Sequence, residues 1–82
     1  MRLFFALVLL IASALPAADD PRFEEAYDLY LRGRFQEALQ LYQQITKDSP
    51  NFAGAWYEMG LCQKELRQFD QAANSFRRAT TI

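Results

Sequence analysis

The chain repeats a pattern of small and aromatic residues at an interval of 34 positions. A shift by that interval superposes small residues on small ones and aromatic residues on aromatic ones. The superposed pairs are Ala26 with Gly60, Ala38 with Ala72, Phe23 with Tyr57, Phe35 with Phe69 and Tyr42 with Phe76. Self-similarity at such an interval is typical of repeat architectures, in which one helical or stranded unit stacks on the next.

Each copy of the pattern predicts two amphipathic helices joined by a tight turn. In the second copy, residues at spacings of three and four share one face of each helix. They are Trp56, Met59, Gly60 and Gln63 on the first helix, and Phe69, Ala72, Ala73, Phe76 and Ala79 on the second. Bulky side chains opposite small ones let antiparallel helices interlock, so we expect Trp56 in the core. No stretch alternates apolar and polar residues as a strand would, and the expected fold class is all-α.

Capping residues set the expected ends of the helices. Asp20 can cap the first helix and Pro21 fits its first turn. Asp28 can pair with Arg32 one turn later. Gly33 can take the left-handed conformation that ends this helix. The expected helices span about 21–32, 35–48, 52–66 and 69–81.

Five residues of the second copy resemble the signature of a tetratricopeptide repeat, a pair of antiparallel helices. They are Trp56, Gly60, Ala72, Phe76 and Ala79. The resemblance implies an α-solenoid of about two tandem hairpins, with a first repeat at 19–52 and a second at 53–82 that is truncated at its end. The first repeat departs from the pattern at Arg22, where the family has tryptophan, and at Glu25, where it has leucine.

In this family the first helices of successive repeats line a concave groove. The resemblance therefore implies a peptide-binding groove lined by Phe23, Tyr27, Tyr30, Tyr57, Leu61 and Lys64. Some members hold a peptide's terminal carboxylate with lysine and asparagine, but Tyr57 and Leu61 occupy two of those positions here. An aromatic groove with a single lysine instead suits an apolar or proline-bearing peptide, or a partner helix. The alternative is that these aromatic residues only pack against one another or against a neighbouring repeat.

Composition argues against several classes of function. The chain has 9 Lys and Arg against 10 Asp and Glu, so it lacks the basic excess of a nucleic-acid-binding protein. It has no histidine, and its single cysteine, Cys62, lacks the usual activating base and cannot form an intrachain disulfide. We expect Cys62 to be structural, with a reactive or intermolecular thiol as the alternative. No catalytic site, metal site or cofactor is expected.

The beginning of the chain has the layout of a secretory signal peptide, in which a positive residue precedes an apolar run and then small residues. We expect residues 1–17 to form this leader, with Ala14 and Ala18 as alternatives to Ala17 as its last residue. The mature protein would be exported, to the periplasm or as a secreted protein, with no stable membrane span. An uncleaved membrane anchor is the alternative, although an apolar run of about 13 residues is short for a bilayer.

These features predict a non-catalytic, exported scaffold that binds a protein or peptide partner in a concave aromatic groove. Two alternatives stay open. In the first, the chain is a self-association unit, a homo-oligomer that fills the groove with its own copies. In the second, it is a fragment of a longer repeat array. The second alternative is suggested because the sequence stops inside its last expected helix, whereas repeat arrays end in atypical capping units.

Overall fold

The computed structural model of the protein describes residues 19–82, which form four α-helices joined by short turns. The helices are α2 (Pro21–Leu31), α3 (Phe35–Asp48), α4 (Ala53–Glu65) and α5 (Phe69–Thr81). The predicted helices at 35–48 and 69–81 match α3 and α5, while α2 and α4 are slightly shorter than predicted. No described residue lies in a strand, and the predicted all-α class is confirmed. The predicted leader, with Ala14, Ala17 and Ala18, lies outside the described residues.

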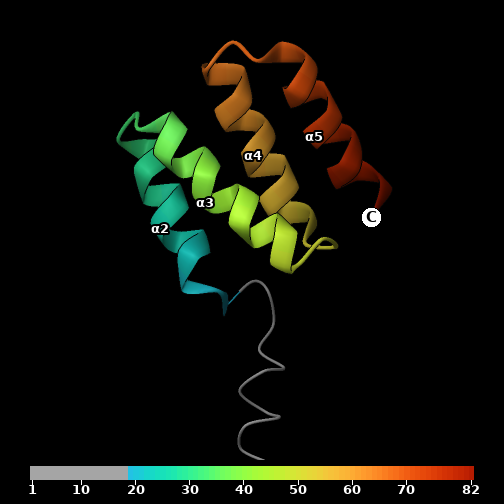
Figure 1. Cartoon of the computed structure of the whole chain (residues 1–82), viewed down its shortest axis with the longest axis horizontal. Helices are drawn as coiled ribbons and strands as arrows, with labels where there is room; N and C mark the ends of the chain where they lie inside the picture. Colours follow the sequence, from blue (N-terminus) through green and yellow to red (C-terminus); the bar gives the residue numbers. More distant parts are fainter. Residues whose placement is uncertain (1–18) are drawn as a thin grey trace, which may run out of the picture.

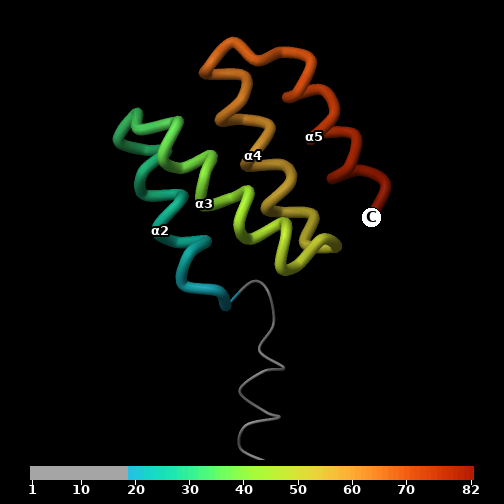
Figure 2. Tube along the Cα trace, viewed as in Figure 1, coloured from blue at the N-terminus to red at the C-terminus, as the bar shows by residue number. Residues whose placement is uncertain are grey.

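The four helices form two antiparallel hairpins that lie side by side. Helix α2 pairs with α3 and α4 pairs with α5, while α3 also packs along α4 (Figure 1). The trace in Figure 2 passes through α2, α3, α4 and α5 in that order across the layer. This arrangement confirms the predicted tandem helix hairpins. None of the helices between residues 19 and 82 combines the length and apolar character that a bilayer crossing requires.

Both hairpins turn in the same way, although different residues make the turn. Gly33 has a φ of 77°, and its N–H donates to the Tyr30 carbonyl at 3.0 Å. The next N–H, of Arg34, donates to the Leu29 carbonyl at 2.9 Å. At the equivalent position of the second hairpin Arg67 has a φ of 63°, and the same two bonds recur at 3.0 and 2.8 Å. This pair of bonds is the Schellman pattern, so the left-handed conformation predicted for Gly33 is confirmed, and Arg67 adopts it at a steric cost.

The start of α2 is fixed by charged side chains. Asp20 accepts a hydrogen bond from the Arg22 N–H at 2.9 Å, which confirms the predicted cap. The hydrogen bond from the Arg22 side chain also lowers the pKa of Asp20. Arg22 reaches α3 as well, where it pairs with Asp48 at 2.9 Å, and the predicted Asp28–Arg32 pair forms at 3.1 Å. Arg22 stands where the family has tryptophan, so an ionic bridge joins the hairpin at this position.

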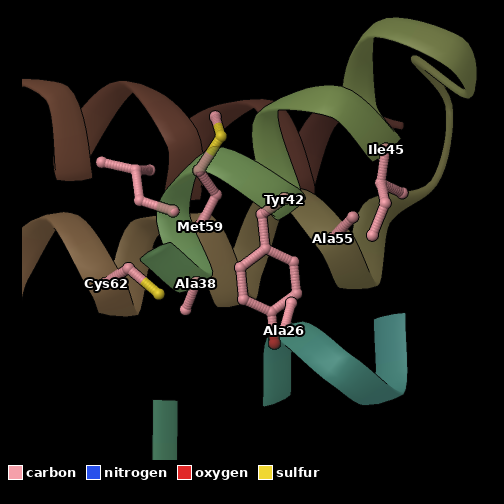
Figure 3. Close-up of a cluster of buried hydrophobic side chains, with 8 residues drawn as sticks. Ala26, Ala38, Tyr42, Ile45, Ala55, Met59 and Cys62 are labelled. Atoms are coloured by element: carbon pink, nitrogen blue, oxygen red, sulfur yellow. The ribbon is translucent and has the colours of Figure 1, made fainter. Parts of the chain in front are cut away.

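The core lies where α2, α3 and α4 meet (Figure 3). Its buried members are Ala26, Ala38, Leu39, Tyr42, Ile45, Ala55, Met59 and Cys62. Tyr42 extends from α3 toward Ala26 of α2, which has no side chain long enough to obstruct the ring (Figure 3). The Phe76 ring of α5 also lies directly against the backbone of α4 at Gly60. A Cβ at this position would be only 2.5 Å from the ring, so the contact requires glycine.

Three residues of the predicted inner faces lie elsewhere. Phe69 is 56% exposed and Ala73 is exposed, so their placement on the inner face is wrong. Helix α5 packs mainly on α4 in the described structure, and its remaining sides face solvent. Trp56 is partly buried and packs on the edge of the core, not inside it. The side of α4 toward α3 is taken by Ala55 and Met59, which leaves Trp56 on the side toward α5.

Candidate functional site

The six residues predicted to line a groove come from α2 and α4, and they differ in exposure. Phe23 is partly buried, and its ring packs on Tyr42 and Phe52 at centroid distances of 5.8 and 4.9 Å. It therefore belongs to the edge of the core. Tyr30 is also partly buried and meets the Phe35 ring edge-to-face at 5.4 Å.

Tyr27 and Tyr57 are the exposed aromatic members of the set, at 46% and 51% exposure. Leu61 is partly buried and Lys64 is exposed. Tyr57 additionally packs against Phe76 of α5, with ring centroids 5.7 Å apart. Large rings exposed to this extent offer a partner both apolar area and a hydroxyl group.

Acidic groups of α4 influence the pKa of Tyr30 in α2. Burial raises the pKa of Tyr30, and the nearby charges of Glu65 and Glu58 raise it further. We refer to Tyr27, Tyr30, Tyr57 and Glu58 together as the tyrosine face.

Glu58 is the member of this face that was not predicted. It is partly buried, and burial raises the pKa of its carboxyl. Its Oε2 atom is shielded from solvent and has no hydrogen-bond partner among residues 19–82. One signal was present in the sequence, because Glu58 is the only charged residue between Asp48 and Lys64. Glu58 is the one charged side chain among residues 53–63 of α4, and this isolation was the signal that could have marked it.

The hydroxyl of Tyr42 in α3, like the Oε2 atom of Glu58, has no hydrogen-bond partner among the described residues. Tyr42 is fully buried, and its hydroxyl makes no hydrogen bond within the described part of the chain. Burial raises the pKa of Tyr42, and the charge of Glu58 acts in the same direction, followed by smaller effects that include Tyr27 and Tyr30. A buried hydroxyl without a partner is uncommon, because desolvation costs free energy that a hydrogen bond would offset.

Elsewhere in the described chain, arginines have partners. Ion pairs join Arg22 to Asp20 and Asp48, Arg32 to Asp28, and Arg34 to Glu37, while Arg77 bonds Asn74, Arg67 lies over Phe69 and Arg78 lies over Trp56. No Lys or Arg of residues 19–82 forms an ion pair with Glu58. Glu58 is therefore a partly buried carboxylate without a cation partner among the described residues.

A second region with recognisable shape is a hollow of about 520 Å³ between α4 and α5. The Trp56 indole forms one wall, donates its N–H to the Pro50 carbonyl at 2.8 Å, and lies 4.6 Å below the Arg78 guanidinium carbon. Ser75 and Gln63 also line the hollow, and the Ser75 hydroxyl donates a buried hydrogen bond to the Gln63 side-chain oxygen. The polar groups of this hollow are thus largely engaged with one another.

Two kinds of group could support redox or metal chemistry among residues 19–82, a reactive thiol and a cluster of metal-ligating side chains. Cys62 is fully buried, and burial raises the pKa of its thiol to about 12, so the reactive thiolate is scarce at neutral pH. Between residues 19 and 82, no group of three or more His, Cys, Asp or Glu side chains is placed to hold a metal ion.

The outer side of α2 differs from the matching side of α4. Met59 and Cys62 of α4 lie in the core that α3 contributes to. Their counterparts 34 positions earlier, Glu25 and Asp28, are exposed and charged. A further helix packed on this side of α2 would have to cover the carboxylates of Glu25 and Asp28, and Asp28 is already paired with Arg32.

Comparison with protein families found a match to the tetratricopeptide repeat over residues 29–81, which is more than half of the 82 residues. Comparisons with curated proteins and with solved structures found no match. The matched range covers the end of α2 and all of α3 and α4, and it ends at the last residue of α5. The hairpin order and the recurring turn bonds agree with that match, and the chain belongs to the tetratricopeptide repeat family.

Proposed function

We propose that this protein is an exported, non-catalytic scaffold that captures a peptide or protein partner along the first helices of its hairpins. Membership of the tetratricopeptide repeat family supports a role in protein interaction. The observation that locates the proposed binding surface on α2 and α4 is the exposure of Tyr27 and Tyr57. Exposed tyrosines are common contributors to binding energy in protein interfaces.

A non-catalytic role agrees with the chemistry of the chain. The sequence has no histidine to act as a base near neutral pH. Its one thiol, at Cys62, is buried with a raised pKa. Repeats of this family typically act as binding scaffolds, and we extend that role to this chain.

Peptides selected from a random display library against the full-length protein provide the test. Binding of a selected peptide is measured by fluorescence anisotropy for the parent protein and for the Tyr27→Ala, Tyr57→Ala double variant. We expect the double variant to lose at least tenfold in affinity while its far-UV circular dichroism stays nearly unchanged. Phe69→Ala is the matched control, because it removes an aromatic side chain of similar exposure from α5, outside the tyrosine face. Equal losses in the control and the double variant would contradict the proposal.

Export is tested separately. Mass spectrometry of the protein recovered from the exported fraction should give an N-terminus between Leu15 and Asp19. Recovery of intact Met1 from the membrane fraction would instead establish the uncleaved anchor.

Self-association is the competing assignment, and its head-to-tail form has complementary charges. Stacking of α5 from one copy on α2 of the next would pair a helix that carries Arg77 and Arg78 with the exposed carboxylates of Glu25 and Asp28. A scaffold that binds other partners should instead be a monomer in light scattering coupled to size exclusion at tens of micromolar. A stable dimer would favour self-association.

A further inference from the structure

The hollow between α4 and α5 is lined by two arginines and by no carboxylate. We propose that it binds an acidic side chain, aspartate or glutamate, from a peptide segment of a partner protein. The guanidinium of Arg78 would be the main contact of the carboxylate, with amide groups of the hollow as further donors. None of the residues that line this site belongs to the tyrosine face, so the inference goes beyond the function proposed above and does not rest on it.

The first argument is that Arg78 is held in place with its hydrogen-bond donors free. The side chain is exposed, and its guanidinium carbon lies over the Trp56 ring, 4.6 Å from the ring centroid. The ring is held in turn by the hydrogen bond from its N–H to the Pro50 carbonyl at 2.8 Å. Contact with an aromatic ring uses none of the five guanidinium N–H donors, and Arg78 forms no ion pair among residues 19–82. The planar pair of N–H groups therefore stays available for the two oxygens of a carboxylate.

The second argument is that contacts within the hollow engage its acceptors more than its donors. Asn74 Oδ1 accepts a hydrogen bond from the Arg77 guanidinium at 3.1 Å. The side-chain oxygen of Gln63 accepts one from the Ser75 hydroxyl. The amide N–H groups of Asn74 and Gln63 remain as donors, and Arg77 forms no ion pair within the described chain. An incoming acceptor with negative charge matches these groups, whereas a basic side chain would meet like charges.

The carboxyl end of α5 opposes an anion, but the arginines outweigh it. A helix end of this kind carries a charge of roughly −0.5. The hydroxyls of Thr80 and Thr81 donate to the carbonyls of Arg77 and Arg78 at 2.9 and 3.2 Å, which satisfies two of the terminal acceptors. Two full positive charges remain beside the hollow, so its net charge favours an anion.

The third argument comes from comparing the two hairpins. A shift of 34 positions superposes Leu29 on Gln63 and Leu41 on Ser75. In the first hairpin the two leucines are partly buried and pack against the core that α4 shares. In the second hairpin Gln63 and Ser75 are only 6% and 3% exposed, and they form a hydrogen bond with each other. The floor is thus polar where its counterpart is apolar, which favours a polar ligand over an apolar helix.

Titration of the full-length protein by nitrogen-15 NMR tests this inference. Trp56 is the only tryptophan of the chain, so its indole N–H gives one signal that reports on the hollow. The probes are the N-acetyl, N-methylamide derivatives of glutamate and of glutamine, its neutral isostere, at constant ionic strength. We expect the glutamate derivative to shift the signals of Trp56, Ser75 and Arg78, and the glutamine derivative to bind at least tenfold more weakly. Added salt should weaken binding of the glutamate derivative, because ions screen exposed charges.

Two variants and one matched control complete the design. Arg78→Gln should weaken binding of the glutamate derivative at least fivefold, and its far-UV circular dichroism should stay unchanged because the side chain is exposed. Gln63→Leu with Ser75→Ala gives the hollow an apolar floor and should weaken binding severalfold. Arg67→Gln is the control, because Arg67 also lies over an aromatic ring, that of Phe69, without lining the hollow. The control should bind as the parent does.

Two further anions identify the source of the negative charge. N-acetylalanine presents the carboxylate of a chain end, and inorganic phosphate presents a phosphoryl group. Tighter binding of either one than of the glutamate derivative would overturn the assignment to an acidic side chain. A dimer of the parent protein that Arg78→Gln dissociates would overturn it as well, since the occupant would then be a second copy of this chain.

The remaining outcomes concern the hollow itself. Equal binding of the glutamate and glutamine derivatives, unchanged binding by Arg78→Gln, or an equal loss in Arg67→Gln would overturn the site, as would the absence of shifts with every probe. The Tyr27→Ala, Tyr57→Ala double variant should bind the glutamate derivative as the parent does. Failure of the proposed function at the tyrosine face would therefore leave this site intact.

Discussion

Replacing Gly60 by alanine tests the close contact between α4 and α5. A Cβ at this position would lie 2.5 Å from Cε1 and 2.7 Å from Cδ1 of Phe76, well inside van der Waals contact. Overpacking of this kind costs about 1–3 kcal/mol. Alanine in place of glycine inside a helix gains about 1 kcal/mol. The net expectation is a loss of about 1 kcal/mol in the free energy of unfolding, or about 4–8 °C in Tm for a domain of this size.

If this contact causes the loss, the effect of Gly60→Ala on the free energy of unfolding should change sign when the Phe76 ring is removed. In a Phe76→Leu background, Gly60→Ala should stabilise the protein by up to about 1 kcal/mol, because only the helix-propensity gain remains. Urea denaturation followed by circular dichroism on the four proteins of this double-mutant cycle gives the coupling free energy. Gly33→Ala is the control, since nothing lies within 4 Å of a Cβ there. Its φ of 77° is unfavourable for alanine, so the loss of stability comes from backbone strain and not from a clash. Its destabilisation should be the same in both backgrounds. Equal effects of Gly60→Ala in the two backgrounds would refute the packing argument.

Three further perturbations have defined outcomes. Asp20→Ala removes the cap of α2 and should cost about 1 kcal/mol in urea denaturation, whereas Asp20→Asn should lose less because an amide oxygen can still cap. Because burial raises the pKa of Glu58 above its ordinary value of 4.5, the parent should lose stability relative to Glu58→Gln as the pH rises through and above that value. A stability difference that does not change with pH would contradict the raised pKa. Cys62 is buried with a pKa of about 12, so a thiol reagent should label it only as fast as the protein opens, and rapid labelling of the native state would place the thiol at the surface.

Helix periodicity and capping rules are local, and the features that depend on them were predictable. The ranges of α3 and α5, the Asp20 cap, the Asp28–Arg32 pair and the left-handed Gly33 all follow from residues within one or two turns of each other. The interval of 34 residues adds the hairpin order, because matching copies must bury matching faces. Ala38 and Ala72, which the shift superposes, are both buried.

Packing between hairpins decided what local rules could not. The sequence marks one face of each helix as apolar, but α4 has neighbours on several sides. Which neighbour takes which side depends on how the hairpins stack. For that reason Trp56 lies at the edge of the core and Phe69 is exposed, although both fit an inward-facing pattern.

The sequence by itself determined the four helices, their turns and the family, because these depend on spacings along the chain and on side chains that act within a turn or two. Only the tertiary structure buried the Oε2 atom of Glu58 and the hydroxyl of Tyr42, and left both without hydrogen-bond partners in the described chain. The physical reason is that hydrogen-bond satisfaction is settled in three dimensions. Whether a buried oxygen finds a donor depends on the neighbouring helices, and no spacing within α4 specifies those.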